Sequence, residues 1–117
     1  MKAWIALAAT ILLLASPALG ADITGRWTAK VVLGNGRSGA PAFVFKQDGA
    51  ALTGTYSGVL GDSALTGTVK GSDVDFHFEV FGRAIRYMGK VNAPGNAIEG
   101  TVDYAGESKG TFSATRK

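Results

Sequence analysis

Glycine recurs every few residues from Ile23 to the end of the chain, and this spacing is incompatible with a stable helix. Between the glycines, Thr, Val, Phe and Tyr follow a period of two, which is typical of half-buried β-strands. The chain has no cysteine, so no disulfide can stabilise such a small domain. We therefore expect an all-β domain whose stability comes from its architecture.

Eight strand-like segments follow one another, mostly with short connections. Their residue ranges are 25–33, 41–47, 51–58, 63–70, 73–81, 84–92, 97–104 and 108–116. Short connections pair each strand with the next one, and closure of the sheet would remove both exposed edges. The sequence thus predicts a closed eight-stranded antiparallel up-and-down (meander) barrel, with an open two-sheet sandwich as the alternative.

The turns predict how four of the hairpins pair. The turn residues are Asp48-Gly49, Gly71-Ser72, Gly82-Arg83 and a three-residue loop at 105–107. The first two turns place Phe45 opposite Leu52 and Val69 opposite Val74. The Gly82-Arg83 turn places Phe78 opposite Tyr87, and the 105–107 loop places Val102 opposite Gly110. The third hairpin would also pair Glu79 with Arg86 and Asp75 with Lys90 on its outer face.

A glycine recurs at the inward positions of five strands. These residues are Gly54, Gly67, Gly89, Gly100 and Gly110, each in a pattern such as Leu-Thr-Gly-Thr-Tyr. Glycine weakens a strand, so its repetition needs a reason. Glycine kinks allow the sharp coiling that a small barrel requires, and we also expect them to leave room for the aromatic side chains opposite.

Residues 1–20 have the features of an export signal. Met1-Lys2 is a short positive start, an apolar run follows, and residues 16–20 supply a helix breaker and small residues. We expect cleavage after Gly20 or Ala21, a single domain at residues 21–117, and a periplasmic or secreted location. The apolar run is shorter than the roughly 20 residues that span a bilayer, so the mature form should have no membrane span. A retained membrane anchor is the alternative.

The charge pattern argues against a nucleic-acid partner. The formal net charge is only +3, and the basic residues are scattered along the chain rather than concentrated on one face. The outward positions show no continuous apolar stripe. We therefore expect a monomer.

The predicted interior is rich in aromatic residues. The inward set is Trp27, Phe43, Phe45, Tyr56, Phe76, Phe78, Tyr87, Tyr104 and Phe112. These side chains can simply fill a small barrel. However, buried tyrosine hydroxyls need hydrogen-bond partners, and a ligand could supply them.

The connections predict which end of the barrel is open. Residues 34–40, 59–62, 82–83 and 105–107 form the end with the longer connections, whereas 48–49, 71–72 and 93–96 form a closed end. A mouth at the first end would lie near Arg37 and Arg83. The predicted ligand-binding residues are Tyr56, Tyr87, Tyr104, Phe43, Phe78, Arg37 and Arg83.

Two segments in order resemble the opening of avidin and streptavidin, which belong to the calycin group of barrels. They are Ile23-Thr-Gly-Arg-Trp27 and the segment from Asp48 to Tyr56. The calycin G-x-W signature matches Gly25 and Trp27, and the resemblance implies that Arg116 packs over Trp27 as a structural lid.

The biotin site of that family is not retained. Tyr56 matches a ligand-contacting tyrosine, but Gly58 stands where the family has a site serine. The tryptophans that sandwich biotin are missing, because Trp27 is the only tryptophan after the signal segment.

No arrangement of residues predicts catalysis, a metal or a cofactor. The G-x-G-x-x-G pattern at residues 34–39 has a strand on each side rather than a following helix, so we interpret it as a flexible loop. His77 shares the outward face with Asp75 and Glu79, about 6.8 Å apart stepwise along a strand. This spacing is too wide for one ion with bonds of about 2 Å.

The sequence therefore predicts a non-catalytic exported barrel that binds a small apolar or aromatic ligand. An acidic group on this ligand would be drawn to Arg37 and Arg83. The alternative is a protein-interaction or structural module with a filled core, which uses its loops or outer face. An enzyme is a third hypothesis that no sequence feature supports.

Overall fold

The computed structural model describes residues 22–117, so the predicted signal peptide lies outside the described residues. The strands are β1 (Gly25–Leu33), β2 (Ser38–Gly39), β3 (Ala42–Asp48), β4 (Ala51–Gly58), β5 (Gly61–Lys70), β6 (Asp73–Val80), β7 (Arg83–Val91), β8 (Ala97–Tyr104) and β9 (Ser108–Arg116). Eight of them match the predicted segments, and the two-residue strand β2 was not predicted. In the described part of the chain, no helix is long and apolar enough to cross a membrane.

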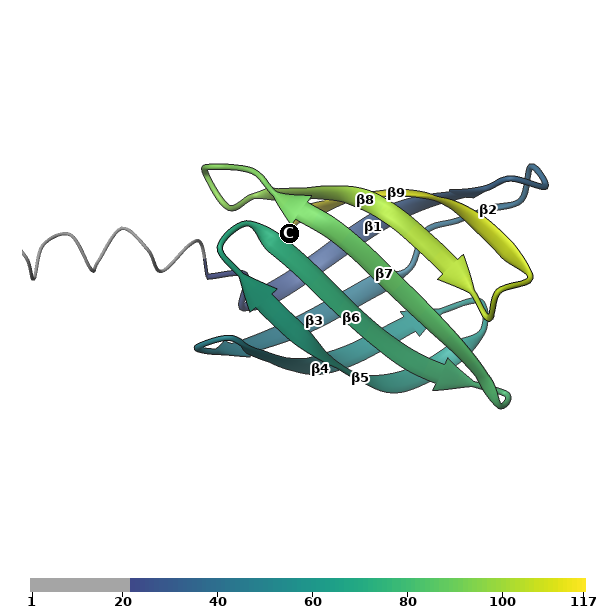
Figure 1. The fold of residues 1–117 in the computed structure, drawn as a ribbon, viewed down its shortest axis with the longest axis horizontal. Coiled ribbons are helices and arrows are strands. Elements are labelled where there is room, and N and C mark those ends of the chain that lie inside the picture. Colours follow the sequence, from purple (N-terminus) through teal and green to yellow (C-terminus); the bar gives the residue numbers. More distant parts are fainter. Residues whose placement is uncertain (1–21) are drawn as a thin grey trace, which may run out of the picture.

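The strands form one closed antiparallel barrel (Figure 1). Each long strand pairs with its neighbour in the chain, and β9 returns to pair with β1 from Trp27↔Arg116 to Leu33↔Gly110. β2 adds only a short extension, which pairs with β1 at Val31↔Gly39 and Val32↔Ser38. The closed eight-stranded meander barrel is confirmed, and the open sandwich is excluded because β1 and β9 are hydrogen-bonded neighbours.

Aromatic rings fill the interior. The predicted inward aromatic residues are buried, apart from Tyr104, which is half-buried. Tyr56 stacks on Phe78 with ring centroids 4.2 Å apart, and Tyr87 stacks on Phe76 at 5.0 Å. Phe43 meets the edge of Tyr87 at 5.3 Å. The barrel is thus packed by its own side chains, as small eight-stranded barrels can be.

The inward glycines allow neighbouring strands to approach closely. A methyl group on Gly54 would overlap the carbonyl oxygen of Val44, and one on Gly67 would overlap that of Asp75. A methyl group on Gly100 would likewise overlap the carbonyl oxygen of Met88. Gly54, Gly67 and Gly100 lie opposite Phe45, Phe76 and Phe112, so the expectation that the glycines leave room for aromatic side chains is confirmed. These rings belong to the packed core, so the room is filled by the protein itself.

Two of the four predicted hairpin registers are confirmed. Val69 pairs with Val74, and Val102 pairs with Gly110. The other two are wrong by two residues: Phe45 lies opposite Gly54 rather than Leu52, and Tyr87 lies opposite Phe76 rather than Phe78. Because strands alternate with a period of two, this shift keeps every side chain on its predicted face.

The shifted register changes the ion pairs on the outer face. Arg86 forms a bidentate pair with Asp75, with N–O distances of 3.0 and 2.6 Å, and Lys90 pairs with Asp73. The predicted pairs of Arg86 with Glu79 and of Lys90 with Asp75 are therefore wrong. The arginine hydrogen bonds hold the pKa of Asp75 below its usual value.

Arg116 and Trp27 close one end of the barrel. The Trp27 ring is buried, its Nε1 donates to the carbonyl of Ile23 at 2.9 Å, and the Arg116 guanidinium lies 4.8 Å from the ring centroid. Arg116 also donates to the carbonyl oxygens of Asp22, Thr24 and Gly95. The guanidinium thus joins the chain before β1 to the β7–β8 connection. Gly25 gives it room, since a Cβ there would lie 3.0 Å from Nη1.

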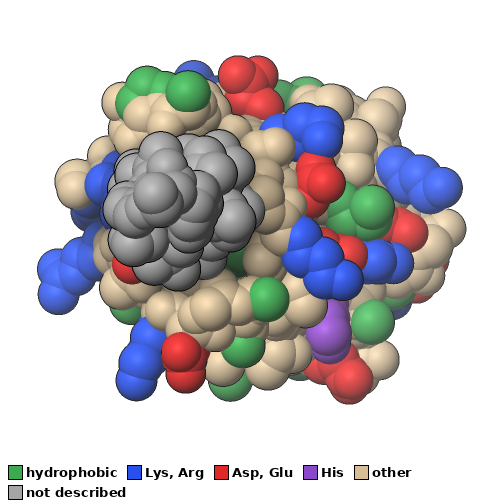
Figure 2. Space-filling model, turned by 60° about the vertical axis from the view of Figure 1, so that its left-hand side comes forward, with side chains coloured by type: hydrophobic (Ala, Val, Ile, Leu, Met, Phe, Trp, Pro, Cys, Tyr) green, Lys and Arg blue, Asp and Glu red, His purple; other side chains and the backbone are tan. Residues whose placement is uncertain are grey.

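Charged side chains of both signs are interspersed over the face that includes this end (Figure 2). The half-exposed apolar side chains of the outer face are Val32 on β1, Val44 on β3 and Met88 on β7. They come from different parts of the sheet and form no common stripe in the described residues.

Candidate functional site

A cavity of about 360 Å³ lies at the end of the barrel that carries the longer connections. We call it the mouth cavity. It is lined by Leu33, Asn35, Arg37, Leu60, Val80, Phe81, Arg83, Ile85, Tyr104, Ala105, Glu107 and Ser108. These residues come from the β1–β2, β4–β5, β6–β7 and β8–β9 connections and the strand ends beside them, at the right-hand end of Figure 1.

The floor of the mouth cavity is apolar. Val80 and Ile85 are buried at adjoining ends of β6 and β7. Leu33, Leu60 and Tyr104 are half-buried and pack against the same core. The aromatic stack below them fills the barrel, so the cavity ends at this floor.

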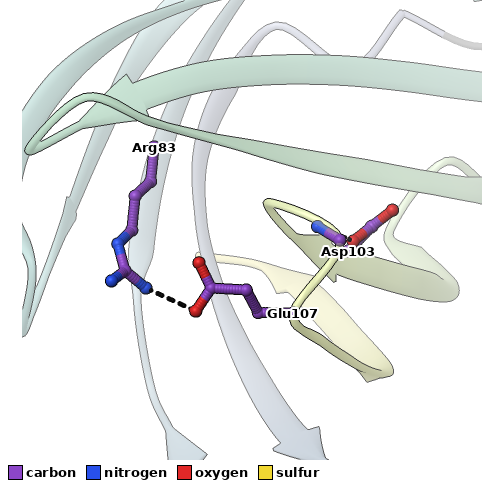
Figure 3. Close-up of polar contacts among 4 residues, drawn as sticks. Arg83, Asp103 and Glu107 are labelled. Carbon is purple, nitrogen blue, oxygen red and sulfur yellow. Dashed lines mark hydrogen bonds and ion pairs between the residues drawn. The ribbon is translucent and has the colours of Figure 1, made fainter.

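The rim carries the polar groups. Arg83 on β7 and Glu107 in the β8–β9 connection point toward one another and form an ion pair with an N–O distance of 2.9 Å (Figure 3). Asp103 stands apart from this pair and accepts a hydrogen bond from the backbone N–H of Gly106, which shapes the same connection. Both partners of the ion pair are more than half exposed, so its contribution to stability is small.

Arg37 is the second arginine of the rim. Its backbone N–H donates to the side-chain oxygen of Asn35, and its carbonyl accepts from the N–H of Leu33. Among residues 22–117, no carboxylate forms an ion pair with its guanidinium. The charged end of Arg37 is therefore available to a ligand.

The predicted site residues separate into two groups. Tyr104, Arg37 and Arg83 line the mouth cavity. Tyr56, Tyr87, Phe43 and Phe78 lie in the filled core below and do not line it.

Several lining residues were missed by the sequence analysis, most notably Phe81 and Leu60. The sequence places Phe81 at the end of a strand, but it occupies a tight turn and its backbone φ is +54°. An aromatic residue immediately before a glycine in a predicted turn was the signal that could have found it.

The core tyrosines differ in how their hydroxyls are satisfied. Burial raises the pKa of Tyr87 well above its usual value. The Tyr104 hydroxyl lies near that of Tyr87, but the Tyr87 hydroxyl makes no hydrogen bond of normal geometry within the described residues. Burial also raises the pKa of Tyr56, although a hydrogen bond from the backbone of Leu60 opposes this effect. Since burial disfavours the charged form, both groups stay neutral at ordinary pH.

His77 lies on the outer face of β6, as expected. Its Nε2 is 3.5 Å from the Thr66 hydroxyl, and the neighbouring Asp75 is engaged by Arg86. A shallow depression of the outer surface includes His77, Asp75 and Arg86, on the opposite side of the sheet from the core.

Comparison with known proteins shows the fold and no family. No protein-family model and no curated protein sequence matches the chain. A redesigned β-barrel is 16% identical with a TM-score of 0.65, and the alignment covers 81% of this chain and 91% of that one. A de novo designed fluorescence-activating β-barrel is 11% identical with a TM-score of 0.59 and coverages of 80% and 93%. A further redesigned barrel, mFAP0 bound to DFHBI, is 15% identical with a TM-score of 0.58 and coverages of 80% and 98%. These likenesses show that the chain is a small β-barrel.

Proposed function

We propose that this protein is a non-catalytic, exported barrel that binds a small apolar or aromatic ligand in the mouth cavity. The observation that carries the proposal is an apolar-floored cavity of about 360 Å³ at the long-loop end of a barrel that is otherwise filled. Small-molecule sites are typically concave, mostly apolar and edged by a few polar groups, with volumes of about 300–1,000 Å³.

The proposal moves the ligand from the barrel interior to its mouth. Tyr56, Phe43 and Phe78 are nearly inaccessible, so their role is to pack beneath the floor. Tyr104 is the tyrosine that reaches the cavity. The mFAP0 barrel, whose fold is similar, is bound to DFHBI, and this supports the idea that a barrel of this size can hold a small ligand.

Kinship with the calycin barrels is part of the proposal. Its support is the position of Arg116 over Trp27, together with Gly25 beside the guanidinium. Export is the other part, and its support is the pattern of residues 1–20. The mass of the protein recovered from the exported fraction tests it: the chain should begin at Ala21 or Asp22, and an intact Met1 would contradict export.

Native mass spectrometry of the mature protein, purified without denaturant, tests ligand binding. We expect a reproducible adduct of a few hundred daltons that is lost on denaturation. The variant Leu60→Trp places a large ring in the mouth cavity and should abolish the adduct. Val44→Trp adds the same ring to the outer face, where Val44 is 46% exposed, and should leave the adduct in place.

A wild-type protein without an adduct, and without binding to any member of a small-molecule library, would overturn the proposal. Loss of the adduct in both variants would also count against it, because the effect would then not belong to the cavity. In either case the filled-core interaction module becomes the better hypothesis.

A further inference from the structure

Phe81 is held at the edge of the mouth cavity in an unfavourable conformation. Its φ of +54° lies in the left-handed region, where a bulky side chain is rare and strained. It is also 85% exposed, so its ring gains little from contact with the core. Two-residue hairpin turns favour Asn, Asp or Gly at this position, and none of them would leave an apolar ring in solvent.

Strained residues of this kind are concentrated at ligand sites, where a partner compensates for the strain. Phe81 lines the same cavity as the floor residues Val80 and Ile85, and Tyr104 lines it too. A flat ring placed in the cavity would contact Phe81 on one side and this apolar floor beneath. It would therefore bury the exposed ring and gain aromatic contacts that an aliphatic ligand would not make.

The rim adds a charge preference. Arg83 is engaged by Glu107, whereas no carboxylate of the described residues pairs with Arg37. Arg37 lines the same cavity as Phe81. An anionic group on the ligand would thus meet one available guanidinium, and Arg83 would contribute little because Glu107 already neutralises it.

Building on the ligand-binding function proposed above, we propose that the ligand is a compact aromatic anion. Its ring packs against Phe81, and its acidic group pairs with Arg37. Phe81 is a specificity-determining residue that the fold keeps at a cost in stability.

Two isosteric probes separate the ring from the charge: 2-naphthoate and its neutral amide, 2-naphthamide. Isothermal titration calorimetry at low ionic strength measures both affinities for the mature protein. We expect naphthoate to bind about fivefold more tightly than naphthamide, the size of effect found for a solvent-exposed ion pair. The preference should shrink as salt is added, because exposed charges are screened.

Three variants assign the contributions. Arg37→Gln should bring the naphthoate affinity down to that of naphthamide and leave naphthamide unchanged. Phe81→Asn should weaken both probes by about tenfold, because it removes a ring contact that both share. Asn is favoured in this turn, so a loss of binding cannot be ascribed to unfolding. Val59→Ser is the matched control: Val59 is 91% exposed on the β4–β5 connection but does not line the cavity, so both affinities should persist.

Equal affinities of wild type for the two probes, or a naphthoate preference that survives Arg37→Gln, would overturn the charge assignment. Unchanged binding in Phe81→Asn would overturn the role of Phe81. If neither probe binds while the native adduct is present and Leu60→Trp removes it, the aromatic-anion inference fails and the proposed binding function stands. If that adduct is missing as well, both fail.

Discussion

At the scale of single residues, the inward glycines determine how closely the strands can approach. Gly67 on β5 faces the backbone of Asp75 and Phe76 so closely that a methyl group would overlap the Asp75 carbonyl oxygen and approach the Phe76 Cα to 2.6 Å. Neither contact involves the free end of a flexible side chain, so relief requires the two strands to separate. A small barrel with a filled core has little freedom to do so.

Gly67→Ala should therefore destabilise the barrel strongly. We expect a loss of about 1–3 kcal/mol in the free energy of unfolding, the usual cost of an overpacked site, measured by urea denaturation. Gly39→Ala is the matched control, because a Cβ at Gly39 meets nothing within 4 Å. Its effect should stay within about 0.5 kcal/mol, as for an ordinary surface substitution. Similar effects of the two changes would show that close approach is not what the inward glycine provides.

Tyr87 should make the stability of the barrel depend on alkaline pH. Burial raises its pKa in the folded state above the ordinary value of 10.0, so at high pH the unfolded chain loses this proton while the folded chain keeps it. Its contribution to stability is thus fully present below about pH 10 and falls above it, by up to about 1.4 kcal/mol per pH unit.

The Tyr87→Phe variant removes this titration together with an unsatisfied buried hydroxyl. At pH 8 we expect its free energy of unfolding to equal or slightly exceed that of wild type, since an unpaired buried polar group is unfavourable. Between pH 10 and pH 11.5, wild type should lose more stability than the variant. Parallel loss in the two proteins, measured by urea denaturation at each pH, would refute the assignment to Tyr87.

At the scale of elements, turn geometry determines the register of each hairpin. Gly71-Ser72 and the loop around Gly106 were located correctly, and the pairs Val69↔Val74 and Val102↔Gly110 followed. The β6–β7 turn is Phe81-Gly82, with Val80 opposite Arg83. Phe is disfavoured at positive φ, so the sequence predicts the turn at Gly82-Arg83, one residue too late. The predicted register of this hairpin is therefore wrong by two residues. The faces were nevertheless predictable, because the alternation of side chains survives a two-residue shift.

Relieving the strain in this turn should stabilise the β6–β7 hairpin. We expect Phe81→Asn to raise the free energy of unfolding by about 1 kcal/mol, because Asn tolerates the left-handed region. For a domain of this size, that corresponds to an increase in Tm of about 4–8 °C, measurable by circular dichroism. Phe81→Ala keeps a Cβ at the same positive φ and should give no such gain. An equal rise in the free energy of unfolding in both variants would mean that the exposed Phe81 ring, rather than the strained backbone, destabilises the hairpin.

At the scale of the whole molecule, the barrel was predictable and the cavity was not. Alternation and short connections were sufficient to predict a closed meander. Whether the interior is empty depends on how the rings of Tyr56, Tyr87 and Phe43 pack together, and a list of inward residues does not contain that information. The position of the long connections still indicated the correct end for the cavity. The apolar lining of the mouth cavity, which includes Leu33 and Ile85, forms only when four connections that are distant in the sequence meet in space.

Closure of the barrel also predicts which backbone amides are protected from hydrogen exchange. In an open sheet, the first and last strands would exchange their amide hydrogens through local fraying, whereas a closed barrel has no such edge. The β1–β9 ladder covers most of β9, from Gly110 to Arg116. We therefore expect amides of β1 and β9 to exchange as slowly as those of β5 and β6, and only through global unfolding, in a hydrogen–deuterium exchange experiment. The short strand β2 is the internal control, because it pairs with β1 at only two positions and should exchange quickly.

Fast exchange along β1 and β9 with slow exchange in β5 and β6 would mean that the seam between β1 and β9 opens in solution. The mouth cavity would then not persist, since Leu33 on β1 and Ser108 on β9 line it from the two sides of that seam.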